Sequence, residues 1–498
     1  MTEADRITWA LEELDPATYR MQTYAKCAAY YQGMHNLAFA TEKFKATFWK
    51  VFKDFSLNLC ASVVDIQTER LEVVGFTSSE ASHKPDTNPA DDNPVAGVMV
   101  DDPSGKKAWD AWERNRLDLV ADEVHASSFL YGDGFLVAQP SEGGLAVWPQ
   151  SPFEMAVHYA DTVPATLDLA AKLFGETIGG KTYWTLYIYT PGRVQRYTLT
   201  TDKDVRPQDA KKFSGDGRVD FSDPEFMPVY HFPNKALGEY GISELRDVFP
   251  LQDALNKTVI DMLVSSEYQA FRQRWATGVE DDEPPDQFDA TNPDSTAPQI
   301  VYTDGDGTPI AVKRGAEHGP GSFLLFADPN SRVGEFGQSD VSPYVQVKNA
   351  FQADVARVSG VPLSYFFVST SETPSGEALK AAEIRFQRKG RRQKRSLGNH
   401  WEHVIAAIAG VGGDVDLNAV WEDDSPRSET EKLNALVLKE SIGVPQAALW
   451  KEMGYDDDEI AAFAAMTPPP SPKPTSPDPT NPAPPPPTPP AKVYLRNV

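Results

Sequence analysis

Cysteine is scarce in this chain: only Cys27 and Cys60 occur among 498 residues. Two cysteines cannot build a disulfide framework or a cysteine-rich metal site. The chain also lacks a run of about 18 apolar residues, which is the length that a membrane-spanning helix needs. The first fifteen residues have neither a basic start nor an apolar centre, so we expect no signal peptide. These absences favour assembly in a reducing, cytosolic environment.

Basic residues are also in short supply. The chain has 72 acidic and 47 basic residues and a formal net charge of −25. A protein that clamps DNA neutralises phosphates with Lys and Arg, so the composition argues against a tight DNA clamp. An acidic channel through which DNA slides fits the same numbers, and so does simple solubility. The length predicts three or four packing units.

Catalytic signatures are equally weak. Residues 175–182, GETIGGKT, match the letters of a phosphate-binding loop. That loop needs a helix directly after its Lys and Thr, whereas the residues after Thr182 alternate as a strand. We therefore predict a glycine-rich hairpin turn, and we keep a packaging ATPase or nuclease that uses this loop as an alternative function.

Two further motifs suggest metal sites but are incomplete. Residues 304–307, DGDG, lack the glycine and the glutamate that a calcium loop places later. His400 and His403 share a helix face, but no third ligand is evident. The sequence therefore predicts no catalytic residue, no metal and no cofactor.

Two helical blocks enclose a strand-rich stretch. The first block is 241–278, in which Pro250 suits the first turn of a helix. The stretch 279–338 follows, and the second helical block begins at Val341. Apolar residues of the first block recur at helical spacing: Leu251, Leu255, Val259, Met262, Leu263, Ser266 and Ala270.

Other elements follow from local patterns. Asp15 is predicted to cap a helix that ends near Gln32. The remaining predictions are helices over 49–69 and 106–130, strands over 71–76, 131–139 and 419–421, a hairpin of 183–189 with 194–200, and short helices within 428–465.

A strongly basic stretch lies in a predicted helix over 375–409. No acidic residue occurs between Glu383 and Glu402. At 100° per residue we expect the charges to surround the helix, so a single DNA-facing stripe explains only part of them. Gly390 and Gly398 are points where bending is cheap. The basic residues are Arg385, Arg388, Lys389, Arg391, Arg392, Lys394 and Arg395.

This order of parts resembles the portal proteins of tailed bacteriophages, of the siphophage head-to-tail type, over about residues 20–465. The sequence features that carry the resemblance are Tyr30–Gly33 at a helix end, YGDGF between a helix and a strand, and the two helical blocks. The resemblance implies an α+β portal fold. Its parts are a wing of helices and a small β layer (1–240), a first stem helix (241–278), a clip (279–338), a returning stem helix (339–361), a tunnel loop (362–374), a bent helix with the wing return (375–427), a helical crown (428–465) and a proline-rich disordered tail (466–498).

The resemblance also implies a structural function in which the chain itself catalyses no reaction. It implies a ring, typically of twelve subunits, at one capsid vertex, through which double-stranded DNA is packaged and ejected without sequence specificity. Implied partners are the terminase large subunit, a head-completion or adaptor protein, and the major capsid protein with its scaffold. We expect a virion protein that passes through the host cytoplasm during assembly. A head–tail adaptor ring is the second alternative, although adaptors are usually shorter.

Three sets of site residues follow from the resemblance. The basic residues of 385–395 would pair with acidic groups of a neighbouring subunit. Small polar residues of the tunnel loop would face DNA: Ser369, Thr370, Ser371, Glu372 and Thr373. Acidic residues at the start of the clip would dock partners: Asp281, Asp282, Glu283 and Asp286.

Overall fold

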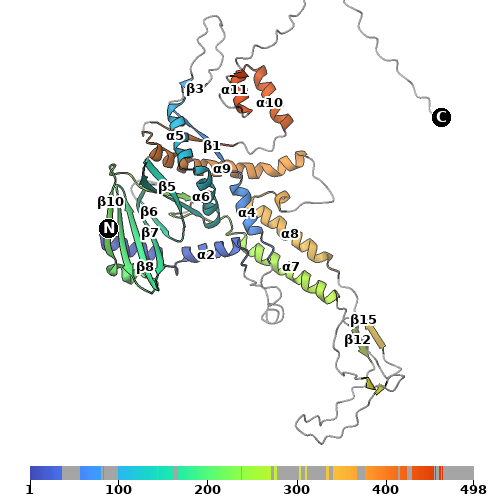
Figure 1. Ribbon diagram of the computed structural model, residues 1–498. Helices are drawn as coiled ribbons and strands as arrows, with labels where there is room; N and C mark the ends of the chain where they lie inside the picture. The colour runs from blue at the N-terminus through green and yellow to red at the C-terminus, as the bar shows by residue number, and fades with distance from the viewer. Residues whose placement is uncertain are drawn as a thin grey trace, which may run out of the picture. The chain divides into compact units, whose positions relative to one another are not determined.

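The structure is a computed structural model, and it divides into two compact units (Figure 1). The first unit comprises Met1–Glu80 and Asp102–Pro426, and the second comprises Ala81–Asp101 and Arg427–Val498. The described residues are 1–35, 56–79, 82–83, 99–142, 144–160, 166–236, 238–270, 274–277, 302–303, 309–310, 332–335, 340–366, 376–412, 415–422, 429–453, 455, 459–460 and 462–463.

Two short helices open the first unit. Helix α1 (Glu3–Glu13) begins at a capping box made by Thr2 and Asp5, and the sequence analysis did not anticipate it. Helix α2 (Tyr19–Tyr31) is capped by Thr18, whose hydroxyl accepts a hydrogen bond from the Met21 amide. The prediction of Asp15 as the cap was wrong, because its carboxylate accepts from the Ala17 amide in the turn between the helices.

An antiparallel five-stranded sheet, in the order β10-β9-β8-β7-β6, forms the next layer. Gly179 and Gly180 both have positive φ and join β7 to β8, as the predicted hairpin requires. A strand therefore follows the glycines where a phosphate loop needs a helix. The strands are β6 (Met155–Tyr159), β7 (Leu167–Ile178), β8 (Lys181–Thr190), β9 (Arg193–Thr200) and β10 (Ser214–Asp220).

A three-stranded sheet packs beside two helices that were predicted as one. Helices α5 (Pro103–Arg114) and α6 (Leu117–Tyr131) are separated at Arg116, which has a φ of 53°. The break places Asn115 where its side-chain oxygen accepts from the Val147 amide of the sheet. The sheet, in the order β11-β4-β5, consists of β4 (Asp133–Ser141), β5 (Gly144–Gln150) and β11 (Val229–Pro233).

The main core joins segments from both ends of the first unit. Strand β1 (Val73–Ser78) pairs with β16 (Leu417–Trp421), so residues more than 300 positions apart form one ladder. Helix α4 (Leu59–Thr68) lies inside the predicted 49–69 helix. Trp112 and Trp401 meet in this core, with ring centroids 5.0 Å apart.

Helices α7 (Phe249–Ala270) and α8 (Ser342–Ser359) lie side by side (Figure 1). As predicted, Pro250 stands in the first turn of α7, which is about 33 Å long at 1.5 Å per residue. Beyond the pair, β12 (Arg274–Thr277) pairs with β15 (Arg332–Glu335), and β13 (Tyr302–Thr303) pairs with β14 (Pro309–Ile310).

Helix α7 also buries polar residues on its packed face, which the apolar stripe did not predict. Gln252 and Asn256 are 0% and 1% exposed. Gln252 accepts from the Leu59 amide, and Asn256 accepts from the Leu57 amide. Their amide groups thereby fix the start of α4 against α7.

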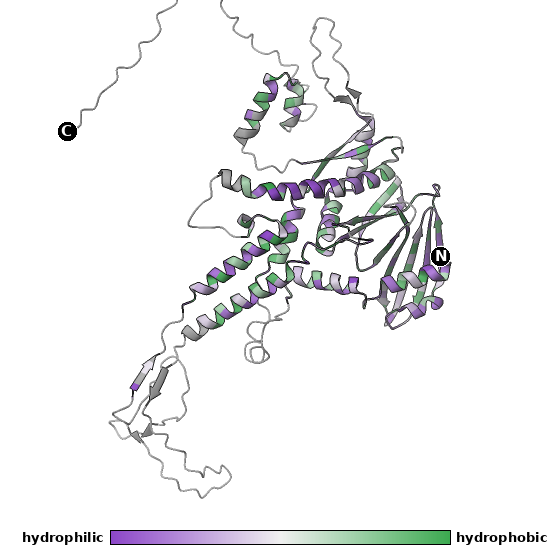
Figure 2. Ribbon diagram, turned by 180° about the vertical axis from the view of Figure 1, so that it is seen from behind, coloured by the Kyte–Doolittle hydropathy of each residue, from purple (hydrophilic) through white to green (hydrophobic). Residues whose placement is uncertain are grey.

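Helix α9 (Gly376–Ala409) runs for 34 residues without interruption, and its middle is coloured mainly hydrophilic in Figure 2. A Cβ on Gly390 would lie 2.8 Å from the Arg70 guanidinium, and one on Gly398 would lie 3.3 Å from Trp421 Nε1. The glycines expected to ease bending therefore allow close packing.

The second unit contains two short helices, α10 (Glu429–Ser441) and α11 (Gln446–Glu452). Gly443, with a φ of 92°, separates them where the sequence predicts a break. Strands β2 (Ser82–His83) and β3 (Met99–Asp101) pair in the same unit. Among the described residues of both units, no helix is long and apolar enough to cross a membrane. The proline-rich tail lies outside the described residues.

Candidate functional site

One buried lysine joins α9 to the base of the helix pair. The Nζ of Lys389 lies 2.6 Å from Oε2 of Glu244 and 2.7 Å from the carbonyl oxygen of Ser359. Glu244 stands just before α7, and Ser359 is the last residue of α8. The final carbonyls of a helix have no partner within it, so Lys389 caps α8 while it binds the segment that leads into α7.

Glu244 is surrounded by donors. Its side chain is 1% exposed, and its Oε1 accepts from Lys235 at 2.8 Å and from Asn234 at 3.0 Å. Burial lowers the pKa of Lys389 to about 8, although attraction to Glu244 limits the fall. Burial opposes ionisation of Glu244 too, but attraction to Lys389 and Lys235 holds its pKa below the ordinary value. The pair is therefore ionised at neutral pH.

The basic residues of α9 separate by type. The two lysines within 385–395 turn toward the protein: besides Lys389, the Nζ of Lys394 donates to the Glu422 carbonyl at 2.6 Å. The arginines are all exposed, and at 100° per residue they lie within a sector of about 120°. The expectation that the charges surround the helix was wrong for the arginines. We call this surface the arginine face: Arg385, Arg388, Arg391, Arg392 and Arg395.

The structure describes only some of the predicted site residues. Lys389 has its partner, Glu244, in the same chain, and Arg385 donates to the carbonyl of Arg357 near the end of α8. An intersubunit role for the basic residues stays a prediction. The tunnel-loop residues 369–373 and the clip residues 281–286 lie outside the described residues.

Asp133 forms a second buried centre, which the sequence analysis missed. Its carboxylate accepts from the Tyr24 hydroxyl at 2.6 Å, from His231 Nε2 at 2.8 Å and from the Gly241 amide at 2.7 Å. Burial favours the neutral acid, but the hydrogen bond and charge of His231, with the Tyr24 hydrogen bond, hold the pKa of Asp133 below its ordinary value. Asp133 thus ties α2, β11 and the segment before α7 to β4.

Glycines let these backbones approach Asp133. Gly132, with a φ of 102°, ends α6 in the left-handed region that favours glycine. A Cβ on Gly241 would overlap the Gly132 carbonyl oxygen and lie 2.6 Å from that of Asn234. The sequence predicted only turn chemistry at Gly132–Gly134. The available signal was an aspartate between two glycines at a helix–strand junction.

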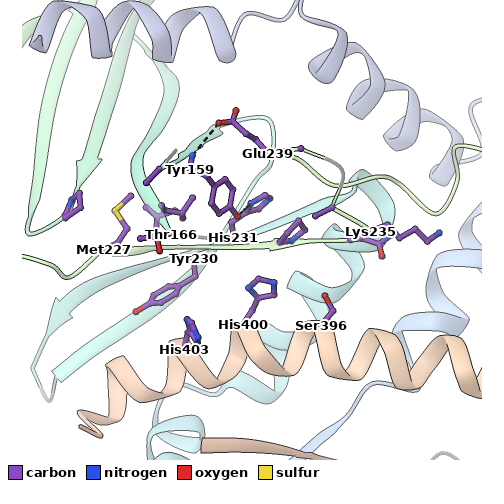
Figure 3. Close-up of a pocket in the computed structure, with 18 of the residues that line it drawn as sticks. Tyr159, Thr166, Met227, Tyr230, His231, Lys235, Glu239, Ser396, His400 and His403 are labelled. Atoms are coloured by element: carbon purple, nitrogen blue, oxygen red, sulfur yellow. Dashed lines mark hydrogen bonds between the residues drawn. The ribbon is translucent and has the colours of Figure 1, made fainter. Parts of the chain in front are cut away.

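A pocket of about 1390 Å³ lies between β11, the segment 233–239 and α9 (Figure 3). Both ring nitrogens of His231 are engaged, by Asp133 and by the Tyr159 hydroxyl at 2.8 Å. Burial, with repulsion from His231 and His403, lowers the pKa of His400 to about 4. The described part of the chain holds no group of three or more potential metal-ligating residues. This arrangement suits packing rather than proton transfer.

Comparisons with known proteins agree on one family. The family model described as "Phage portal protein, SPP1 Gp6-like" matches residues 14–467. The portal protein of Mycobacterium phage L5 is 23% identical over 377 residues, which cover 72% of this chain and 71% of that protein. The portal protein of Mycobacterium phage D29 is 23% identical over 373 residues, which cover 71% of each chain.

Solved structures with similar chains include those of a gene transfer agent. A chain of the structure described as "Virion of native gene transfer agent (GTA) particle" has 13% identity and a TM-score of 0.41, with 89% of this chain and 93% of that chain covered. A chain of "Neck of native GTA particle computed with C12 symmetry" has 14% identity and a TM-score of 0.38, with 82% and 90% covered.

Proposed function

The chain belongs to the SPP1 Gp6-like family of phage portal proteins, and from that premise we propose that it forms a closed ring at one capsid vertex, through which double-stranded DNA is packaged and ejected. It is a structural component of the virion and not an enzyme. The observation that carries the proposal is the family match over residues 14–467. Twelve copies is the number that the sequence resemblance implies.

The helix pair supports the ring. Val345, Val347 and Val358 of α8 are 42%, 45% and 40% exposed in the single chain. Apolar side chains at these positions gain from burial against a neighbour, and repeated head-to-tail contacts between copies close into a ring. In this arrangement α7 and α8 form the stem. The tunnel loop, 362–374, comes directly before α9 in the sequence.

A ring has a direct test. Electron micrographs of the purified protein should show particles with a central hole, and light scattering should give a mass of many copies. A stable monomer at micromolar concentration, in buffers that support capsid proteins, would contradict the proposal.

Partner docking is the second part of the proposal. We assign the clip, with Asp281, Asp282, Glu283 and Asp286, to contacts with the terminase large subunit during packaging and with head-completion proteins afterwards. Contacts with the major capsid protein and scaffold would fix the ring in the shell. Replacement of 281–296 by a Gly/Ser linker should leave rings intact and reduce DNA packaging; unchanged packaging would refute the docking role.

The tunnel loop is the third part. Ser369, Thr370, Ser371, Glu372 and Thr373 are small, polar or acidic, which suits a surface along which DNA slides without binding. Substitution of Ser371 and Thr373 by Leu should spare the ring and change packaging or DNA retention. Loss of the ring in this variant would place the loop at a structural contact instead.

A further inference from the structure

The arginine face of α9 has little charge compensation within the part of the chain that the structure describes. Arg385 donates to the carbonyl oxygen of Arg357. Arg388, Arg391, Arg392 and Arg395 are exposed, and no carboxylate among the described residues forms an ion pair with them. Five like charges within 11 residues of one helix repel each other. A partner with negative charge would therefore stabilise this face.

The same unit also has an acidic surface, on which negative charges repel each other. The β1–β16 ladder ends where the Glu422 amide donates to the Glu72 carbonyl at 2.9 Å. Helix α6 adds Asp118 and Asp122. Burial, repulsion from Glu422 and Asp122, and a hydrogen bond with Glu422 raise the pKa of Glu72, while burial and repulsion from Asp118 raise that of Asp122. We call these four residues the acidic patch.

The two surfaces lie on different elements. Glu422 directly follows β16, and its carbonyl oxygen accepts a hydrogen bond from Lys394. Around the axis of α9, Lys394 lies about 120° from Arg388, the centre of the arginine face. A subunit therefore presents a cationic surface on α9 and an anionic surface on α6 and at the end of the β1–β16 ladder. This is the requirement for a head-to-tail contact that repeats around a ring.

We propose that the arginine face of one subunit binds the acidic patch of the next subunit. The inference rests on the proposed ring and adds the surfaces that hold neighbours in register. A second copy fits better than DNA as the partner, because every copy supplies both surfaces in equal number. Complementary charged surfaces also set the orientation of partners and exclude wrong ones.

Charge exchange between copies tests the proposal. The first variant carries R388E, R391E and R395E, and the second carries E72K, D122K and E422K. Each variant alone should form at least about tenfold less ring, which corresponds to about 1.4 kcal/mol. The two variants mixed, with different tags, should form rings that contain both tags, since each reversed surface then meets its complement. A single chain with all six changes should also form rings.

Other outcomes would overturn the proposal. If the six-change chain forms rings but the mixture does not, the surfaces meet within one subunit. If the first variant forms normal rings and loses only DNA retention, the arginine face binds DNA. Failure of both rescues, with each variant folded by circular dichroism, would also refute the contact. Lys203 and Lys211 are exposed elsewhere, and their reversal to Glu is the matched control. Absence of rings from the unmodified protein would instead refute the ring itself.

Discussion

Lys389 and Glu244 form a buried ion pair, with Nζ and Oε2 2.6 Å apart. The same Nζ binds the last carbonyl of α8. Three segments thus meet at one nitrogen: the base of α7, the end of α8 and the middle of α9, with Glu244 145 residues and Ser359 30 residues from Lys389. In the proposed ring, this pair fixes the stem against the helix that carries the arginine face.

Removal of Lys389 should therefore cost stability. K389M leaves Glu244 buried with Lys235 and Asn234 as its remaining partners. Loss of one partner of a buried pair costs about 3–5 kcal/mol, and we expect the lower end because Lys235 remains. Urea unfolding measures the change. K203M, at an exposed position outside both charged surfaces, should change stability by less than about 0.5 kcal/mol. Equal stability of the two variants would show that the pair contributes nothing.

Stability should fall in acid because of His125. This residue is fully buried, its Nε2 accepts from Trp401 Nε1 at 2.8 Å, and burial lowers its pKa to about 3. The unfolded chain titrates near pH 6.5, so it binds a proton between pH 6.5 and 3 that the folded chain does not. The contribution is complete above pH 6.5 and falls by about 1.4 kcal/mol per pH unit below it.

The variant H125Q should reduce that slope. His400, with a pKa of about 4, remains in the variant and keeps part of the pH dependence. Free energies of unfolding measured from pH 7.5 to 5 should run parallel for both proteins above pH 7 and diverge below pH 6. Parallel curves over the whole range would mean that His125 titrates in the folded chain as it does in the unfolded chain.

Gly241 should tolerate no side chain. A Cβ there would overlap the Gly132 carbonyl oxygen, and relief requires movement of backbone next to Asp133. We expect G241A to lose about 2 kcal/mol or more, as overpacked sites do. A Cβ on Gly412 meets no atom within 4 Å, so G412A is the matched control. A thermal unfolding midpoint of G241A equal to that of G412A would contradict the close approach.

Lys181 should be dispensable. It begins β8, opposite Ile178 in the hairpin, and it has no helix after it to bind phosphate. Purified rings should hydrolyse no ATP, and K181A should leave ring assembly and the unfolding midpoint unchanged. ATP hydrolysis that disappears in K181A would revive the packaging ATPase alternative.

Local features of the fold could be predicted from the sequence because they depend on neighbouring residues. The turn at Gly179–Gly180 follows from two glycines between alternating strands, and Pro250 marks the start of α7. The break at Ser441–Pro445 is likewise local. In each case the backbone preference of a few residues decides the outcome.

The sequence by itself therefore determined the family and the local turns at Gly179–Gly180 and Ser441–Pro445. Only the tertiary structure decided which basic residues of α9 turn toward the rest of the protein. Lys389 turns inward because Glu244 and Ser359 lie beside it, and Lys394 does so because the Glu422 carbonyl is within reach. Those partners come from segments 28 to 145 residues away. A helical pattern gives the angle between side chains, but the side that faces the protein depends on contacts that exist only after the chain has folded.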